Sequence, residues 1–303
     1  MSTRLSRGGA AAFIVLVALL LGQQLLGRNV ATPRENRITI LYDAFGKPST
    51  MTQDWGYSAL IEHDGKRILF DIGNNPTIFA RNVKAAGVDL KQLDFVVLSH
   101  RHLDHTASLS HLLDLNPDVK IYVPRDGVFG GSIPGKFYRR HDSLPDEMRY
   151  FAGKPSEPLT SGVPWLNGRF VMVDSTLEAV PGVHLISLIS ESAGTKELPE
   201  LSMALETPRG LVVVAGCSHP GIERIVAAAA RIHPRVHSVF GGLHLPSAPD
   251  PEIARIAAAL RDTYKVERIA PGHCTGEPAF YHFKKTWKDR YTYAGVGTVI
   301  DLP

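Results

Sequence analysis

Short apolar runs, separated by glycine, proline and charged residues, recur along the chain from residue 38 to residue 302. They predict strands at residues 38–45, 57–62, 67–71, 95–99, 119–123, 169–173, 183–189, 202–206, 211–215, 236–240, 266–269 and 296–302. The segments between them predict helices at residues 76–86, 106–115, 221–232, 251–264 and 277–287. This order predicts an α/β fold, an αββα sandwich of two mixed β-sheets flanked by helices, in one domain of residues 36–303.

Local turn signals support parts of this assignment. Asp64-Gly65 lies between two strand-like runs and predicts a tight β-hairpin. Pro76 in the first turn and Gly87 just beyond the last turn mark the limits of the first helix. Residues 124–164 are rich in glycine, proline and charge, and a loop of that length in a compact domain is usually functional or disordered.

The N-terminus has a different pattern. Arg4 and Arg7 precede an uncharged stretch, residues 8–27, whose centre is continuously apolar. This pattern is typical of a secretory signal, and the stretch is nearly long enough to span a bilayer. We therefore expect residues 1–31 to be a signal peptide or a membrane anchor. The rest of the chain is then exported, either periplasmic or anchored to the membrane by this N-terminal helix.

Composition narrows the function classes. The net charge is +3, without the basic stripe expected of a dedicated nucleic-acid binder. The chain has 13 His and 2 Cys, which excludes a disulfide scaffold and directs attention to histidine chemistry. In an exported protein the two cysteines, Cys217 and Cys274, leave one disulfide open as an alternative.

The most informative segment follows the apolar run at residues 95–99, where His100, His102, Asp104 and His105 occur within six residues. In an extended segment, side chains two residues apart point to the same side, so His100, His102 and Asp104 can converge. Imidazole and carboxylate groups bind Zn²⁺ and other divalent first-row metals. Four such groups exceed what one tetrahedral ion takes from a single segment, which favours two neighbouring ions.

Three later histidines each follow an apolar strand and lie beside glycine: His219, His244 and His273. Strand ends in α/β folds are where binding sites gather, and glycine permits close backbone approach there. We expect His219 and His273 to be metal ligands, and His244 to be a ligand or an acid facing the substrate.

The His-x-His-x-Asp-His segment after an apolar strand resembles the signature of the metallo-β-lactamase superfamily. Residues 69–73, Leu-Phe-Asp-Ile-Gly, resemble the upstream Asp-containing strand end of that family. Narrower similarities at residues 55–62, 216–221, 241–245 and 272–276 resemble a branch that includes the archaeal 7,8-dihydropterin-6-methyl-4-(β-D-ribofuranosyl)aminobenzene 5'-phosphate synthase. The resemblance spans roughly residues 38–302.

The resemblance implies a division of the ligands between two metals. His100 and His102 would bind the first metal, and Asp104, His105 and His273 the second. His219 falls where many members place a bridging Asp, so it would bind the first metal or lie between the two. Asp71 would accept a hydrogen bond from a ligand imidazole. No segment between residues 183 and 205 resembles the family's usual third ligand of the first metal.

These features predict a hydrolase that uses two divalent metal ions, with zinc preferred and manganese, iron or magnesium as alternatives. Water activated by the metals would attack a small ester, phosphoester or amide, with Asp104 and His244 as catalytic groups. The basic, glycine-rich residues 130–141 could clamp an anionic small-molecule substrate or form a solvated loop. Two alternatives stay open: a transferase of the pterin-synthase kind with a pyrophosphate leaving group, and a non-catalytic metal- or ligand-binding protein.

Overall fold

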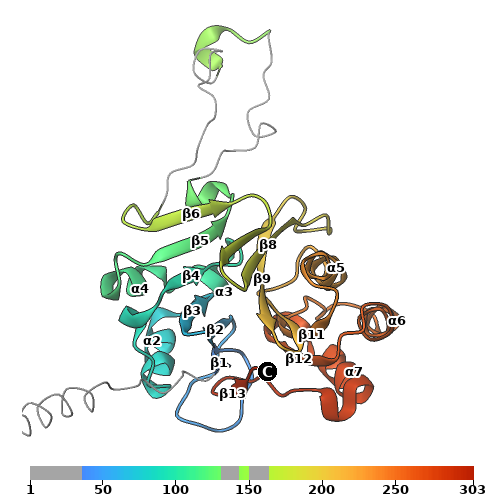
Figure 1. Ribbon diagram of the computed structural model, residues 1–303. Helices are drawn as coiled ribbons and strands as arrows, with labels where there is room; N and C mark the ends of the chain where they lie inside the picture. Colours follow the sequence, from blue (N-terminus) through green and yellow to red (C-terminus); the bar gives the residue numbers. More distant parts are fainter. Residues whose placement is uncertain (1–35, 131–142, 150–163) are drawn as a thin grey trace, which may run out of the picture. The chain divides into compact units, whose positions relative to one another are not determined.

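Two β-sheets face each other in the computed structural model, which describes residues 36–130, 143–149 and 164–303 (Figure 1). The expected signal or anchor at residues 1–31 lies outside the described residues, as does nearly all of the 130–141 segment. Among the described residues, no helix has the length and apolar character needed to cross a membrane.

The first sheet has seven strands in the order β13-β1-β2-β3-β4-β5-β6. Pairing is antiparallel from β13 to β3 and parallel from β3 to β6, so the sheet is mixed. Its strands are β1 (Arg37–Tyr42), β2 (Ser58–His63), β3 (Lys66–Phe70), β4 (Phe95–Val97), β5 (Lys120–Pro124), β6 (Arg169–Val173) and β13 (Val299–Asp301).

The second sheet has six strands in the order β12-β11-β10-β9-β8-β7. It is also mixed, because β10, β11 and β12 are parallel while the pairs from β10 to β7 are antiparallel. Its strands are β7 (Leu177–Val180), β8 (Val183–Ile189), β9 (Pro199–Thr207), β10 (Gly210–Ala215), β11 (Val236–Gly242) and β12 (Arg268–Gly272).

Helices cover the outer faces of both sheets (Figure 1). The first sheet is covered by α2 (Pro76–Ala85) and α4 (Leu109–Leu115), with the short α3 (Leu103–Thr106) before α4. The second is covered by α5 (Ile222–Ile232), α6 (Asp250–Ala258) and α7 (Glu277–Trp287). Shorter helical turns are η1 (Leu90–Gln92), η2 (Gly127–Phe129), η4 (Asp146–Met148), η6 (Ala259–Thr263), η7 (His273–Thr275) and η8 (Lys288–Arg290).

The alternation of side chains between the two faces of each strand explains how the layers pack. In β10, Val212 and Val214 belong to the apolar cluster shared by the two sheets, whereas Val213 and Ala215 pack under α5–α7. Successive side chains of a strand point to opposite faces, so a wholly apolar strand is buried on both sides. The predicted αββα sandwich of two mixed sheets is therefore the observed fold.

Several local predictions also match the structure. Asp64 and Gly65 connect β2 to β3 with φ angles of 46° and 76°, as the hairpin signal requires. Helix α2 starts with Pro76 behind the Asn75 cap, whose side chain accepts hydrogen bonds from two backbone N–H groups, and Gly87 follows with φ 65°.

Other elements depart from the prediction in part. The helix expected at residues 106–115 begins only at Leu109, as α4, and α3 is a separate turn before it; the helix expected at residues 251–264 ends at Ala258 and continues as η6. Strand β7 was not predicted, because its four residues lie at the sheet edge and are only partly buried. Strand β4 ends before residue 99, because the Ser99 N–H donates to the Asp71 carboxylate at 2.7 Å.

Candidate metal centre

All seven residues selected from the sequence meet where strands of both sheets end. His100 and His102 follow β4, and Asp104 and His105 lie in α3; His219, His244 and His273 follow β10, β11 and β12. The ring of His100 is 4.3 Å from that of His105 and 4.7 Å from that of His219, between centroids. The two sheets therefore bring residues from distant parts of the chain into one cluster.

The first part of this cluster contains His100, His102 and His219. Nε2 of His100 lies 3.0 Å from Nδ1 of His102, and the rings of His102 and His219 are 4.9 Å apart between centroids. Two nitrogens bound to one tetrahedral Zn²⁺ lie about 3.3 Å apart, given Zn–N distances of about 2.0–2.1 Å. The spacing of the His100 and His102 nitrogens therefore fits ligation of a single ion.

The second part contains Asp104, His105 and His273. Oδ2 of Asp104 lies 3.3 Å from Nε2 of His273 and 3.7 Å from Nε2 of His105. His273 is buried, yet neither of its ring nitrogens has a hydrogen-bond partner among the described residues. A buried polar atom without a partner costs about 1–3 kcal/mol. A divalent cation between these groups would supply the missing partner, so the donor set fits a metal ion.

A carboxylate and a hydroxyl fix two of these rings. Nδ1 of His105 donates to Oδ2 of Asp71 at 2.7 Å, as the sequence led us to expect of Asp71. Ser99 Oγ donates to the same oxygen at 2.8 Å and lies 2.9 Å from Nδ1 of His100. Because Nδ1 is occupied in both rings, Nε2 of each is left to face the cluster.

Two acidic residues of the site were not predicted. Glu200 accepts a hydrogen bond from His219 Nδ1 at 2.8 Å and others from the backbone N–H groups of residues 217–219. Asp43 accepts the backbone N–H of His273 at 2.9 Å. Glu200 lies outside the strand predicted at residues 202–206, and Asp43 lies 230 residues from its partner, so neither had a local signal.

In most residues of the cluster, the local electrostatics favour the protonation state that can bind a metal, which is a neutral imidazole or an ionised carboxylate. Burial lowers the pKa values of His100 and His102, which keeps both rings neutral. Burial opposes ionisation of Asp104, but His273 and His105 nevertheless hold its pKa below the usual value. For His105, burial lowers the pKa, but the Asp71 carboxylate outweighs this and raises it to about 9. A metal ion at His105 would therefore displace a proton.

The backbone of the site is strained at four positions that are not glycine. Asp71, Ser218, His244 and His273 have φ angles of 55°, 64°, 51° and 45°. Residues other than glycine rarely adopt this left-handed backbone conformation. Those that do cluster at functional sites, where the surrounding structure holds them. All four lie in the loops that follow the strand ends of the cluster.

Both cysteines are buried and free, so the disulfide that the sequence left open is not formed. Cys217 Sγ lies 3.2 Å from His105 Nε2. Among the described residues, Cys217 belongs to each of three groups with metal-ligand spacing: with His100 and His219, with His105 and His273, and with His244 and Cys274.

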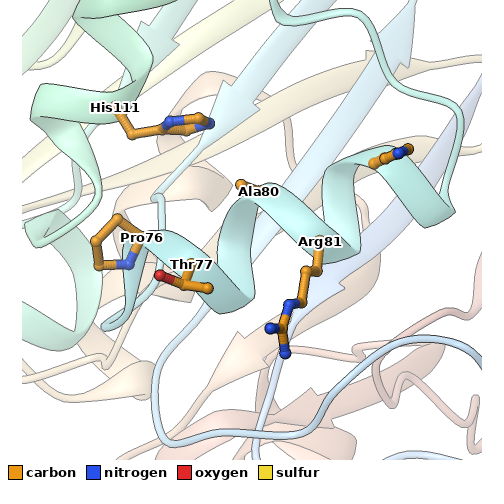
Figure 2. Close-up of a pocket in the computed structure, with 6 residues that line it drawn as sticks. Pro76, Thr77, Ala80, Arg81 and His111 are labelled. Atoms are coloured by element: carbon orange, nitrogen blue, oxygen red, sulfur yellow. The ribbon is translucent and has the colours of Figure 1, made fainter.

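A cavity of about 300 Å³ opens beside the cluster. His219 and His244 line it together with Arg224 and Arg255. His244 is exposed and its ring lies 4.4 Å from that of His219, so it stands between the cavity and the buried ligands. A second hollow, of about 410 Å³, lies on α2 and includes Arg81 and His111 (Figure 2). It shares no residue with the cluster.

Comparisons with known proteins agree with this geometry. Residues 52–197 match the family model of the metallo-β-lactamase superfamily. The chain is 28% identical, over 290 residues, to the 7,8-dihydropterin-6-methyl-4-(β-D-ribofuranosyl)-aminobenzene-5'-phosphate synthase of Methanocaldococcus jannaschii. That match covers 86% of this chain and 95% of the synthase.

Solved structures show the same fold. One is Tm1679, a metal-dependent hydrolase of the β-lactamase superfamily, with a TM-score of 0.64 and 24% identity, covering 88% of this chain and 99% of that one. Another is the metallo-β-lactamase fold protein YhfI from Bacillus subtilis, with a TM-score of 0.53 and 14% identity over the same shares of the two chains.

Proposed function

Because this chain has the metallo-β-lactamase fold and belongs to that superfamily, we propose that it is a hydrolase that depends on two divalent metal ions. The observation that carries the proposal is His273, whose buried ring nitrogens have no hydrogen-bond partner among the described residues and whose Nε2 lies 3.3 Å from Oδ2 of Asp104. The first ion would be held by His100, His102 and His219, and the second by Asp104, His105 and His273.

The bound ions would lower the pKa of water and polarise the electrophilic centre of the substrate. The chain's own residues perform the remaining tasks. Asp71 and Glu200 hold the rings of His105 and His219 in orientation through their Nδ1 hydrogen bonds. Asp104 is ionised and one-fifth exposed, so it can also orient the attacking water. His244 is exposed at the cavity, where it can donate a proton to the leaving group.

The cavity supports a small substrate, because about 300 Å³ is the lower end of the range for ligand pockets. Arg224 and Arg255 on its lining favour an anionic group, although both also pair with glutamates: Arg224 with Glu191, and Arg255 with Glu223 and Glu252. A phosphoester therefore fits best among the ester, phosphoester and amide substrates that the sequence left open.

A transferase is the second candidate, and a specific observation favours it: the similarity to the archaeal synthase covers 86% of this chain and 95% of the synthase. In such a reaction the same ions would hold a pyrophosphate leaving group. Export would argue against it, since activated pterins are cytoplasmic metabolites. A binding protein without turnover is the third candidate, and the ionised Asp104 beside the cluster argues against it.

Metal content of the purified full-length chain, measured by elemental mass spectrometry, tests the proposal. We expect two equivalents of metal, zinc in preference to manganese, iron or magnesium, and loss of both in a His102→Ala/His105→Ala control. Hydrolysis of phosphoesters, esters and lactams is then assayed, with release of pyrophosphate as the readout for the transferase. A chain that binds no metal after reconstitution would refute the enzyme proposal.

A further inference from the structure

A hollow of about 450 Å³ at the C-terminal end of α7 is lined by basic side chains. Its residues come from three elements, η6, α7 and η8, and it shares none with the metal cluster or with the cavity beside that cluster. The charged residues on its lining are Arg261, Lys285, Lys288, Arg290 and Asp289. Four positive charges therefore accompany one negative charge in a space large enough for a small ligand.

Three of the four cations have no ion-pair partner in the described part of the chain. Arg261 forms an ion pair with its neighbour Asp262 at 2.7 Å. The side chains of Lys285, Lys288 and Arg290 form no ion pair with a described residue, and all three are exposed. Like charges gathered in one hollow repel each other, and the protein walls around them strengthen their field. The hollow therefore attracts an anion.

The end of the helix does not by itself account for this gathering of cations. The helix dipole favours cations in the last turn, which explains a residue such as Lys284, whose exposed side chain does not line the hollow. Arg261 and Arg290 lie in η6 and η8, outside the last turn of α7, yet they line the same hollow. The packing of three elements brings these side chains together.

Lys288 occupies a backbone conformation that suits glycine. Its φ and ψ angles are 54° and −118°, at the position that caps the C-terminal end of α7. A residue with a Cβ is strained there, and glycine is the residue usually found where a helix ends with positive φ. Strained residues of this kind cluster at functional sites. The presence of a lysine where glycine would be more stable therefore indicates a task for its ammonium group.

We propose that this hollow binds a phosphate group. Ammonium and guanidinium groups bind phosphate oxygens through short, charge-assisted hydrogen bonds, and His282 on the same lining can add a further donor. The hollow is compact, and the chain has no basic stripe of the kind that follows a nucleic-acid backbone, which favours a single phosphate or diphosphate group. That group can belong to a small soluble anion or to the head group of a lipid. The binding is separate from the proposed metal-dependent reaction and does not rest on it.

Urea unfolding of the metal-loaded, full-length chain in increasing inorganic phosphate, at constant ionic strength, tests the proposal. A ligand that binds only the folded chain raises the unfolding midpoint, and the dependence on its concentration gives the dissociation constant. We expect Lys285→Gln to weaken binding about tenfold, because one charge-assisted hydrogen bond is lost. Lys284→Gln, the same change at the adjacent residue outside the hollow, should leave the constant unchanged. Phosphate bound at the metal centre contributes equally in both variants, so the difference between them belongs to the hollow.

Lys288→Gly separates binding from folding. Glycine relieves the strained backbone, so the unfolding midpoint without phosphate should be at least that of the wild type. Loss of the ammonium group should weaken phosphate binding about tenfold. A variant that is as stable as the wild type cannot have lost its affinity through misfolding.

Vesicle sedimentation identifies the source of the phosphate group. Phosphatidylcholine vesicles with and without phosphatidylglycerol are mixed with the wild type, Lys285→Gln and Lys284→Gln, so that any insertion of residues 1–31 contributes equally to all three. Binding that requires phosphatidylglycerol and is weakened only in Lys285→Gln assigns the site to lipid head groups, and a response to inorganic phosphate alone assigns it to a soluble anion. Equal behaviour of the wild type, Lys285→Gln and Lys288→Gly towards both probes would overturn the proposal. Metal content and hydrolysis are unaffected by either outcome, so the proposed hydrolase stands or falls separately.

Discussion

Glu200 accepts a hydrogen bond from Nδ1 of His219 at 2.8 Å, and both side chains are almost fully buried. Asp71 has the same relation to His105, at 2.7 Å. One carboxylate–histidine pair thus serves each half of the cluster, from different sheets. A carboxylate on Nδ1 fixes the tautomer and makes Nε2 a stronger ligand, so each proposed ion has its own supporting acid.

Replacing Glu200 with Gln should weaken binding of the first metal by about 10–100-fold, because the acceptor on Nδ1 of His219 loses its negative charge. Chelator competition on the purified chain measures the affinity. The matched control is Glu206→Gln on the same strand, where the carboxylate pairs with His184 away from the site. Equal affinity in Glu200→Gln and the wild type would show that the hydrogen bond does not support a ligand.

His273→Leu should affect stability far more with metal than without it. In the metal-free chain the substitution removes the buried Nδ1, which has no hydrogen-bond partner among the described residues, together with the 3.3 Å contact of Nε2 with Asp104, so the two effects oppose each other and the free energy of unfolding should change by no more than about 1 kcal/mol. In the metal-loaded chain it removes a ligand, so the stabilisation by metal should fall sharply. Urea unfolding with and without a chelator measures both changes. An equal loss of stability in both states would mean that the ring contributes through packing alone.

His244→Asn should lower the turnover rate by about 10²–10⁴-fold while leaving the metal content unchanged, as expected for an acid that touches the substrate. Single-turnover assays and elemental analysis of the same preparation provide the two readouts. His111→Asn, in the separate hollow on α2 (Figure 2), is the control and should alter neither. Loss of metal in His244→Asn would assign the residue to the ligands instead.

Acid stability should depend on His63, which lies at the end of β2, outside the cluster. Burial lowers its pKa in the folded chain, partly offset by Asp64. Between the lowered pKa of folded His63 and the unfolded value of about 6.5, the unfolded chain binds a proton that the folded chain does not. The contribution of His63 to stability is therefore complete above about pH 6.5 and is lost as the pH falls below it. In a chelating buffer, denaturant titrations of His63→Leu between pH 7 and pH 5, in about half-unit steps, should lose less stability than the wild type. Parallel curves would exclude this role for His63.

Residues 1–31 should direct export in a Gram-negative host. Cell fractionation followed by intact-mass measurement distinguishes the forms: a shortened periplasmic chain indicates a cleaved signal, and a full-length membrane-bound chain indicates an anchor. A full-length chain in the cytoplasm would contradict export, and would also remove the argument against the transferase.

The sequence alone determined the sandwich fold and the residues of the cluster, because these depend on local patterns. Alternation in the strands, the Asp64-Gly65 turn and the spacing of His100, His102 and Asp104 are set within a few residues by backbone geometry. Histidines placed just after apolar strands, such as His219, were found for the same reason, since strand ends gather at one edge of a sheet.

Only the tertiary structure decided which groups support or join that cluster. Cys217 meets His105 across 112 residues, and Asp43 meets His273 across 230, when the two sheets pack together. Contacts over such separations depend on the packing of whole layers, which no short stretch of residues encodes. The sequence therefore indicated a metal site at the strand ends, and the packing of the sheets placed Cys217 beside His105 and Glu200 beside His219.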